Sequence, residues 1–129
     1  GVHLGSGFPR FNPGEFTAAD VLARGEADAA LIIASDPMSN FSQPARDHLA
    51  TIPIVVLDPK LSDTARIAEV AFTVSTYGIN TGGTVYRMDD VPIPLRPAFE
   101  SPYKSDLEVL RGIESRIRQR QLADPASDA

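Results

Sequence analysis

Two unbroken apolar segments, each ending in the dipeptide Asp-Pro, constrain the fold of this chain more than any other feature of its sequence. The first occupies residues 28–37 and the second occupies residues 53–59. A continuous apolar run of this kind is typical of a strand that is covered on both of its faces. The segment between them leaves room for a helix, so we expect parallel neighbouring strands joined by a right-handed crossover.

Helices are expected around these two strands. Thr17 can cap a first helix that Gly25 ends, and a second helix is expected over residues 44–50, which begin with proline. A short helix is expected within residues 64–69, and the apolar residues 70–74 form a third candidate strand. This order of elements predicts an α/β fold with a doubly wound, mainly parallel sheet of the Rossmann-like kind.

A hairpin and a last helix are expected towards the C-terminus. Residues 84–88 alternate in the manner of a strand, residues 89 and 90 can form a turn, and residues 91–95 can return beside the first segment. Ser105 can cap the last helix, because Glu108 stands at the capping-box position three residues later. The fold class is therefore completed by a C-terminal hairpin and helix.

Size and composition argue against several classes of protein. With 129 residues, of which 43% are hydrophobic, the chain can bury one core. We expect a single α/β domain over residues 1–122, as part of a longer subunit, and a disordered tail over residues 123–129. A formal net charge of -5 argues against binding to nucleic acid. No apolar run approaches the roughly 20 residues that span a bilayer, so we expect no membrane role and a cytoplasmic location.

The ends of the two Asp-Pro segments are the best candidate for a binding site. Ligands of open parallel sheets bind outside the carboxyl ends of the strands, where an acidic residue can accept hydrogen bonds from a ribose. Asp58 occupies that position after the second strand, and Asp36 ends the preceding strand. Asp and Pro also favour turns, so the alternative is that both pairs only end their strands.

Other residue types that often carry chemistry have no supporting pattern. Without cysteine, this segment can form no disulfide, thiolate zinc site or iron–sulfur cluster. His3 and His48 belong to no cluster of metal ligands, so no metal site is expected. Ser35, Ser39 and Ser42 lie outside a G-x-S-x-G pattern, which argues against a serine hydrolase. We therefore expect no catalytic residue in this chain.

Three stretches of the sequence together resemble one known family. They are residues 12–18, residues 27–37, and residues 80–93 with their paired glycines, alternating apolar residues and acidic turn. In order and content they are similar to the B subunit of formylmethanofuran dehydrogenase and of its bacterial relatives, the formyltransferase/hydrolase complexes. The resemblance implies formaldehyde oxidation through tetrahydromethanopterin and methanofuran-type carriers. This chain would then be a structural part, without a cofactor, beside the other subunits of such a complex.

The wider superfamily of molybdopterin oxidoreductases supports an alternative. Its nucleotide-binding region is similar to the loop around Ser35, Asp36 and Pro37, taken together with Asp58, Lys60 and the nearby Thr64. By that resemblance these six residues would bind molybdopterin guanine dinucleotide, as a domain of a molybdenum or tungsten dehydrogenase. A third alternative, a stand-alone nucleotide-binding α/β domain, predicts saturable nucleotide binding by the isolated chain.

Overall fold

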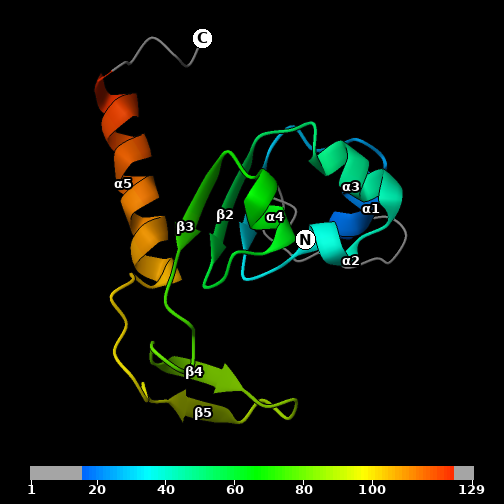
Figure 1. Ribbon diagram of the computed structural model, residues 1–129. Coiled ribbons are helices and arrows are strands. Elements are labelled where there is room, and N and C mark those ends of the chain that lie inside the picture. Colours follow the sequence, from blue (N-terminus) through cyan, green and yellow to red (C-terminus); the bar gives the residue numbers. More distant parts are fainter. Residues whose placement is uncertain (1–15, 124–129) are drawn as a thin grey trace. The chain divides into compact units, whose positions relative to one another are not determined.

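The structure is a computed structural model that describes residues 16–123 (Figure 1). The chain divides into two compact units, residues 1–72 and residues 73–129, and each unit is described by itself. The expectation for His3 lies outside the described residues, and so does the disordered tail expected over residues 123–129, except for Ala123, which is the last residue of the C-terminal helix.

A three-stranded sheet forms the centre of the first unit. Its strands are β1 (Ala30–Ile33), β2 (Ile54–Asp58) and β3 (Val70–Thr73), in the spatial order β1-β2-β3. β1 and β2 are parallel, with Ala30 opposite Ile54 and Ile33 opposite Leu57, and β3 runs in the same direction (Figure 1). The parallel pairing expected from the two apolar segments is therefore confirmed.

Four short helices accompany this sheet in the part of the unit that the structure describes, and local sequence explains where they begin. They are α1 (Ala18–Ala23), α2 (Pro37–Asn40), α3 (Gln43–Leu49) and α4 (Asp63–Ile67). Thr17 caps α1 by accepting a hydrogen bond from the backbone of Asp20 at 3.2 Å. Gly25, with φ of 70°, follows the end of α1 in the left-handed conformation that glycine adopts without strain. The sequence had indicated α1, α3 and α4, but not α2.

The core of the first unit lies on one face of the sheet. The three strands lie side by side in the order in which they follow one another in the sequence. Because crossovers between parallel strands are right-handed, the two crossover helices α3 and α4 lie on the same face of the sheet. The buried cluster there joins α1, α3 and α4 to the strands and consists of Leu22, Ile32, Ala45, Leu49, Ile54, Val56 and Ala65. On the other face of β1, Leu31 is 55% exposed and Ile33 is 38% exposed.

The expectation that both strands are covered on both faces is therefore correct only for β2, where Leu57 on the opposite face is also buried. For β1 it is wrong, because the described helices of this unit pack against the face that bears Ile32. The described residues form an α/β unit with a parallel sheet. Within the first unit, the described helices pack on one face of that sheet and the strand order shows no reversal, so the doubly wound arrangement is not confirmed.

The second unit contains the expected hairpin and C-terminal helix. Strands β4 (Gly83–Tyr86) and β5 (Pro92–Leu95) pair in antiparallel register, with Tyr86 opposite Pro92. The capping box that begins α5 (Asp106–Ala123) is present. Glu108 accepts hydrogen bonds from the backbone and hydroxyl of Ser105, at 2.8 and 2.7 Å.

Candidate functional site

The carboxyl ends of β1 and β2 enclose a small cavity in the first unit. Its volume is about 380 Å³, which lies at the lower end of the range typical of ligand pockets. Its lining residues come from the two strand ends and from α2, and are Ala34, Ser35, Asp36, Asn40, Asp58, Pro59 and Lys60. The cavity therefore occupies the position at which open parallel sheets bind their ligands.

The loop after β1 is held in place by Asp36. Oδ1 of Asp36 accepts two hydrogen bonds from Thr64, one from the backbone N–H at 2.9 Å and one from the hydroxyl at 2.6 Å. Oδ2 accepts one bond from the hydroxyl of Ser39 at 2.7 Å and one from the backbone N–H of Asp63 at 3.3 Å. A carboxylate has about four acceptor positions. Asp36 therefore uses its hydrogen-bonding capacity to join the β1 loop to the start of α4.

These contacts also determine the ionisation of Asp36. Partial burial favours the neutral acid, but the hydrogen bonds from Thr64, Ser39 and the backbone of Asp63 outweigh it and lower the pKa of Asp36 to about 2. Asp36 is thus a carboxylate at neutral pH. Its negative charge lies at the edge of the cavity.

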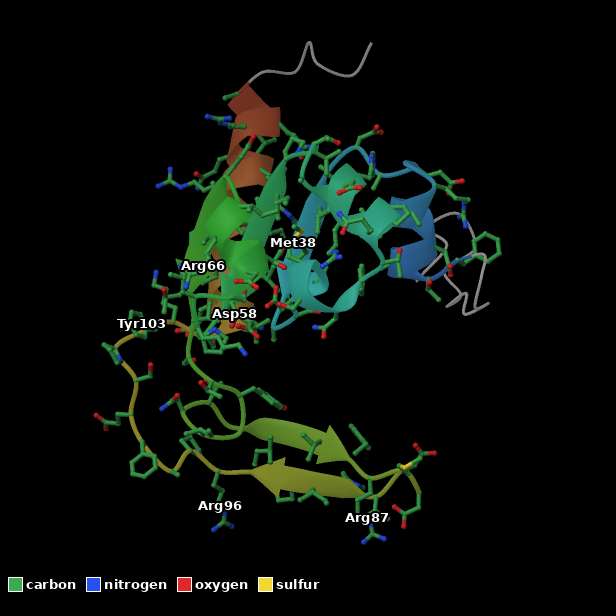
Figure 2. The ribbon with its side chains drawn as sticks, turned by 45° about the vertical axis from the view of Figure 1, so that its right-hand side comes forward. Met38, Asp58, Arg66, Arg87, Arg96 and Tyr103 are labelled. Carbon is green, nitrogen blue, oxygen red and sulfur yellow. The ribbon has the colours of Figure 1, made fainter. Side chains whose placement is uncertain are left out.

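Asp58 has a different environment from Asp36. It ends β2 and is only 6% exposed, and it lies at the lower end of the sheet in Figure 2. Among the described residues its carboxylate accepts one hydrogen bond, to Oδ1 from the backbone N–H of Lys60 at 3.0 Å. Because a carboxylate can accept several bonds, Asp58 retains acceptor capacity towards the cavity that it lines.

Ala34 is a part of this site that sequence reasoning did not identify. Its φ of 49° lies in the left-handed region, which costs a residue with a side chain roughly 1–2 kcal/mol. Backbone strain of this kind is concentrated at functional sites. Ala34 lies between the last residue of β1 and Ser35, so it turns the chain from the strand into the cavity loop. Nothing in the residue type signals this, because left-handed positions are usually marked by Gly, Asn or Asp.

The six residues proposed to bind a cofactor divide into two groups. Ser35, Asp36, Asp58 and Lys60 line the cavity. Pro37 is instead buried at the first position of α2.

Thr64, the sixth residue, is fully buried away from the cavity lining. Its hydroxyl accepts a hydrogen bond from the backbone N–H of Met38 at 3.0 Å. Pro37 and Thr64 therefore support the loop from within. Asn40 lines the cavity as well and donates from its side chain to the carbonyl oxygen of Asp36 at 2.9 Å, although sequence reasoning missed it.

Other candidate groups have local explanations in the structure. Nε2 of His48 donates to the carbonyl oxygen of Ala27 at 2.8 Å, which holds α3 against the segment that precedes β1. Over residues 16–123 there is no group of three side chains that could together hold a metal ion. Within the same range, no helix has the length and apolar character needed to cross a membrane.

The cavity suits a ligand that offers hydroxyl groups and negative charge together. Asp58 can accept from a hydroxyl or amine, while the exposed Lys60 can pair with a phosphate or carboxylate. Ser35 is exposed at the cavity and can donate or accept. These side chains can bind and orient such a ligand at the strand ends.

Two curated proteins are similar to nearly the whole chain. The B subunit of tungsten-containing formylmethanofuran dehydrogenase 2 from Methanocaldococcus jannaschii is 42% identical over 121 residues, which are 92% of this chain and 28% of that protein. The protein of the same name from Methanococcus maripaludis is 38% identical over 119 residues, which are 91% of this chain and 27% of that protein. The chain thus spans about a quarter of the length of the curated relatives that it matches. No family model matches the chain.

One solved structure has a similar fold over nearly the same span. It is a chain of the formyltransferase/hydrolase complex from Methylorubrum extorquens, which was crystallised with methylofuran. The TM-score is 0.66 at 25% sequence identity, and the similarity covers 94% of this chain and 33% of the solved chain. The similarities by sequence and by structure therefore each cover more than nine tenths of this chain.

Proposed function

This chain is homologous to a part of the B subunit of formylmethanofuran dehydrogenase, and we propose that it serves as a structural part of such a protein in a one-carbon complex. The complex would be of the formyltransferase/hydrolase kind, and its other subunits would be the partners of this one. The 42% identity over 92% of the chain supports the relation to the B subunit, and the observation that favours this kind of complex is the similarity to a chain of a formyltransferase/hydrolase complex.

The structural likeness gives independent support. A similarity over 94% of this chain to one chain of a formyltransferase/hydrolase complex favours the same kind of assembly here. Exposed apolar side chains on the second unit, among them Tyr86, Met88 and Phe99, would be available for contacts with partner proteins.

We propose in addition that residues 1–122 act as one α/β domain of the complete subunit, and that its sheet is doubly wound. The parallel order β1-β2-β3 supports this, since it corresponds to one half of such a sheet. The exposed apolar face of β1 supports it as well, because the second layer of a doubly wound fold would cover it.

A second candidate function is binding of molybdopterin guanine dinucleotide, as part of a molybdenum or tungsten dehydrogenase. The cavity at the strand ends favours it, because Asp58 retains acceptor capacity there. Ser35, Asp58 and Lys60 would hold the nucleotide end of the cofactor, while Asp36, Pro37 and Thr64 would keep the loop in place. When bound, the cofactor would supply the metal for redox chemistry. The curated relatives are named as tungsten-containing enzymes.

One experiment separates the two candidates. The full-length subunit, carrying an affinity tag, is purified with its partners, and the intact complex is analysed for molybdenum, tungsten and extractable pterin nucleotide. The structural proposal predicts co-purification of formyltransferase/hydrolase subunits and no stoichiometric metal or pterin. A stoichiometric metal with pterin nucleotide would overturn it in favour of the dehydrogenase. A subunit that is isolated without partners would contradict both.

A further inference from the structure

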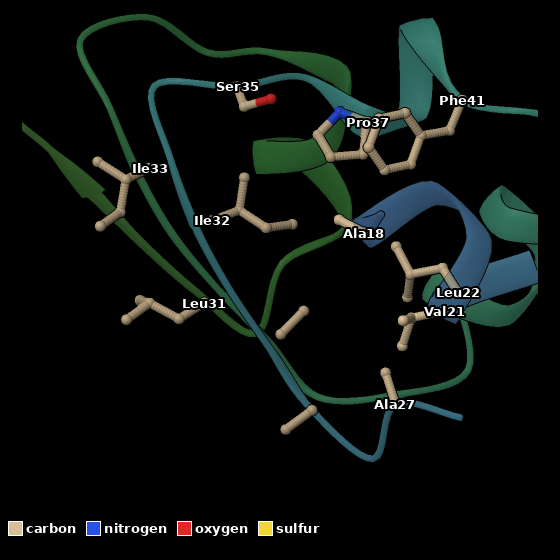
Figure 3. Close-up of a pocket in the computed structure, with 12 residues that line it drawn as sticks. Ala18, Val21, Leu22, Ala27, Leu31, Ile32, Ile33, Ser35, Pro37 and Phe41 are labelled. Atoms are coloured by element: carbon tan, nitrogen blue, oxygen red, sulfur yellow. The ribbon is translucent and has the colours of Figure 1, made fainter. Parts of the chain in front are cut away.

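The two units differ in what can cover their exposed apolar side chains. In the first unit, Figure 3 shows Leu31 and Ile33 directed away from α1, on the sheet face that the doubly wound fold proposed above would cover. In the second unit, exposed apolar side chains gather where the β4–β5 hairpin turns. This hairpin tip, residues 86–91, bears the exposed side chains of Tyr86, Met88 and Val91.

The hairpin tip has a defined backbone. The N–H of Arg87 donates to the carbonyl oxygen of Val91 at 3.0 Å and closes a loop of three residues, of which Asp90 is the last. The N–H of Asp90 donates to the carbonyl oxygen of Arg87 at 3.0 Å, and its φ of 60° is left-handed. Three-residue hairpin loops usually end in this way, most often with glycine. Asp90 therefore bears backbone strain, which is concentrated at functional sites.

The edges of the hairpin are poorly suited to a further strand. Pro92 and Pro94 of β5 cannot donate to β4, so both occupy non-hydrogen-bonded positions of the ladder. Their nitrogens therefore lie on the outer edge of β5, which lacks these two donors. On β4, the hydroxyl of Tyr77 donates to the carbonyl oxygen of Thr84 at 3.1 Å. A partner of the hairpin would accordingly contact side chains of the tip.

The charges of the hairpin tip leave one carboxylate unpaired. Arg87, which is labelled at the end of the hairpin in Figure 2, donates from Nη2 to Oδ2 of Asp89 at 2.6 Å. These two charges neutralise one another on the tip itself. Among residues 16–123, the carboxylate of Asp90 has neither a hydrogen bond nor an ion pair. The tip thus presents apolar side chains beside one unpaired negative charge.

We propose that the hairpin tip is a docking site for another subunit of the complex, which binds Tyr86 and Met88 in an apolar pocket and pairs a basic side chain with Asp90. Aromatic residues, methionine and arginine are enriched at interfaces between proteins, and the tip bears Tyr86, Arg87 and Met88 in succession. The flexible thioether of methionine packs well against irregular apolar surfaces. The inference rests on the proposed function, because it takes the chain as part of a complex of several subunits.

Other occupants fit the hairpin tip less well. A second copy of this chain has a formal net charge of -5, which opposes its approach to Asp90. The remaining part of the same subunit would enclose the tip within a domain core. Three of the six tip residues are charged, and charged residues are rare in cores but common at the rims of interfaces.

A cross-link identifies the occupant. A photo-reactive amino acid replaces Met88 in the full-length subunit, the complex is purified and irradiated, and the cross-linked peptide is sequenced. A cross-link to another subunit supports the inference. A cross-link to the same subunit or to a second copy, or the absence of any cross-link, would overturn it. If no partner subunits co-purify at all, the proposed function itself has failed, which is a distinct result.

Three substitutions test the contacts of the tip. The dissociation constant between the full-length subunit and its purified partner subunits should rise at least about tenfold in Met88→Ala, which removes the apolar anchor. Asp90→Asn tolerates the left-handed backbone and removes only the charge, so association should become slower and less dependent on salt. Glu100→Gln, at another exposed carboxylate of this unit, is the control and should leave both quantities unchanged. Equal behaviour of all three variants would overturn the inference.

Oxidation of methionine gives an independent readout. Peroxide converts accessible methionine thioethers to sulfoxides and is itself reduced to water. In the intact complex, Met88 should be oxidised no faster than the half-buried Met38 of the first unit. In the full-length subunit that has been separated from its partners, Met88 should be oxidised much faster than Met38, because its side chain is fully exposed. Oxidation of Met88 at the same rate in both preparations would contradict the inference.

Discussion

The carboxylate of Asp36 and the hydroxyl of Thr64 are joined by a hydrogen bond of 2.6 Å, although 28 residues separate them in the sequence. The bond connects the loop after β1 to α4 after β2, and Thr64 is fully buried beneath it. The shape of the candidate cavity depends on this contact, because Asp36 is part of the cavity wall.

Replacing Thr64 by valine should destabilise the first unit. Thr64→Val keeps the shape of the side chain but leaves Asp36 without one donor and the N–H of Met38 without its acceptor. Unsatisfied buried groups cost about 1–3 kcal/mol, so the free energy of unfolding should fall by about that amount in urea denaturation. Thr84→Val, at an exposed position of β4, is the control and should change stability by less than about 0.5 kcal/mol. Equal stabilities of the two variants would contradict the buried contact.

The low pKa of Asp36 predicts a specific acid sensitivity. An aspartate whose pKa is about 2 in the folded protein, against about 3.9 in an unfolded chain, stabilises the fold fully above the unfolded value. That contribution is lost as the pH falls from about 4 through about 2. Asp36→Asn should remove this part of the pH dependence in denaturation curves, and Ser39→Ala, which deletes one donor, should reduce it. An unchanged pH profile in Asp36→Asn would show that Asp36 does not carry the effect.

If the complete protein binds a nucleotide, Asp58 should contribute directly to the affinity. Asp58→Asn removes a charged acceptor that lines the cavity, and a hydrogen bond to a charged group contributes about 1.5–3 kcal/mol. The dissociation constant for guanosine diphosphate, measured by calorimetry, should rise at least about tenfold. Asp28→Asn, at an exposed position before β1, is the matched control and should leave it unchanged. An unchanged dissociation constant in the Asp58→Asn variant would exclude this cavity as the nucleotide-binding site.

The left-handed backbone at Ala34 predicts an unusual response to glycine. Glycine adopts a φ of 49° without the steric cost that alanine bears, so Ala34→Gly should keep or slightly raise the free energy of unfolding. Ala30→Gly, within the regular part of β1, should lower it by roughly 0.5–1 kcal/mol. If both glycine variants are equally destabilised, as thermal unfolding would reveal, the conformation at Ala34 is not strained.

Two glycines of the second unit should respond to alanine with opposite signs. A Cβ at Gly83 would lie 2.8 Å from Cζ of Tyr77, so Tyr77 must move and lose its hydrogen bond to the carbonyl oxygen of Thr84. Gly83→Ala should therefore lower stability by about 1 kcal/mol. Gly112→Ala in α5 meets no atom within 4 Å and should raise stability by roughly 0.5–1 kcal/mol. Thermal unfolding of the two variants checks the signs, and a shift in the same direction would contradict this packing.

Features that depend on neighbours in the sequence could be predicted from the sequence. The apolar segments indicated the positions of β1 and β2, and their parallel pairing followed from the segment between them, which is long enough to hold a crossover helix. Thr17 caps α1, and the reciprocal bonds of Ser105 and Glu108 begin α5, as expected. These capping contacts join residues three positions apart, so the spacing of residue types is sufficient to indicate them.

The tertiary structure alone decided which face of the sheet is covered and what each site residue does. Asp36 and Asp58 look alike in the sequence, since each precedes a proline at the end of an apolar segment. Packing brings four hydrogen-bond donors to the carboxylate of Asp36, three from residues 63 and 64 and one from Ser39. The carboxylate of Asp58 accepts one hydrogen bond, from the backbone of Lys60, and keeps its remaining acceptor capacity. The two hydrogen bonds from Thr64 to Asp36 join residues that are 28 positions apart, and they give Asp36 a structural role that Asp58 does not have. These bonds form only when α4 packs beside the β1 loop. Contacts of that range have no signature in local spacing, because they depend on the whole arrangement of strands and helices.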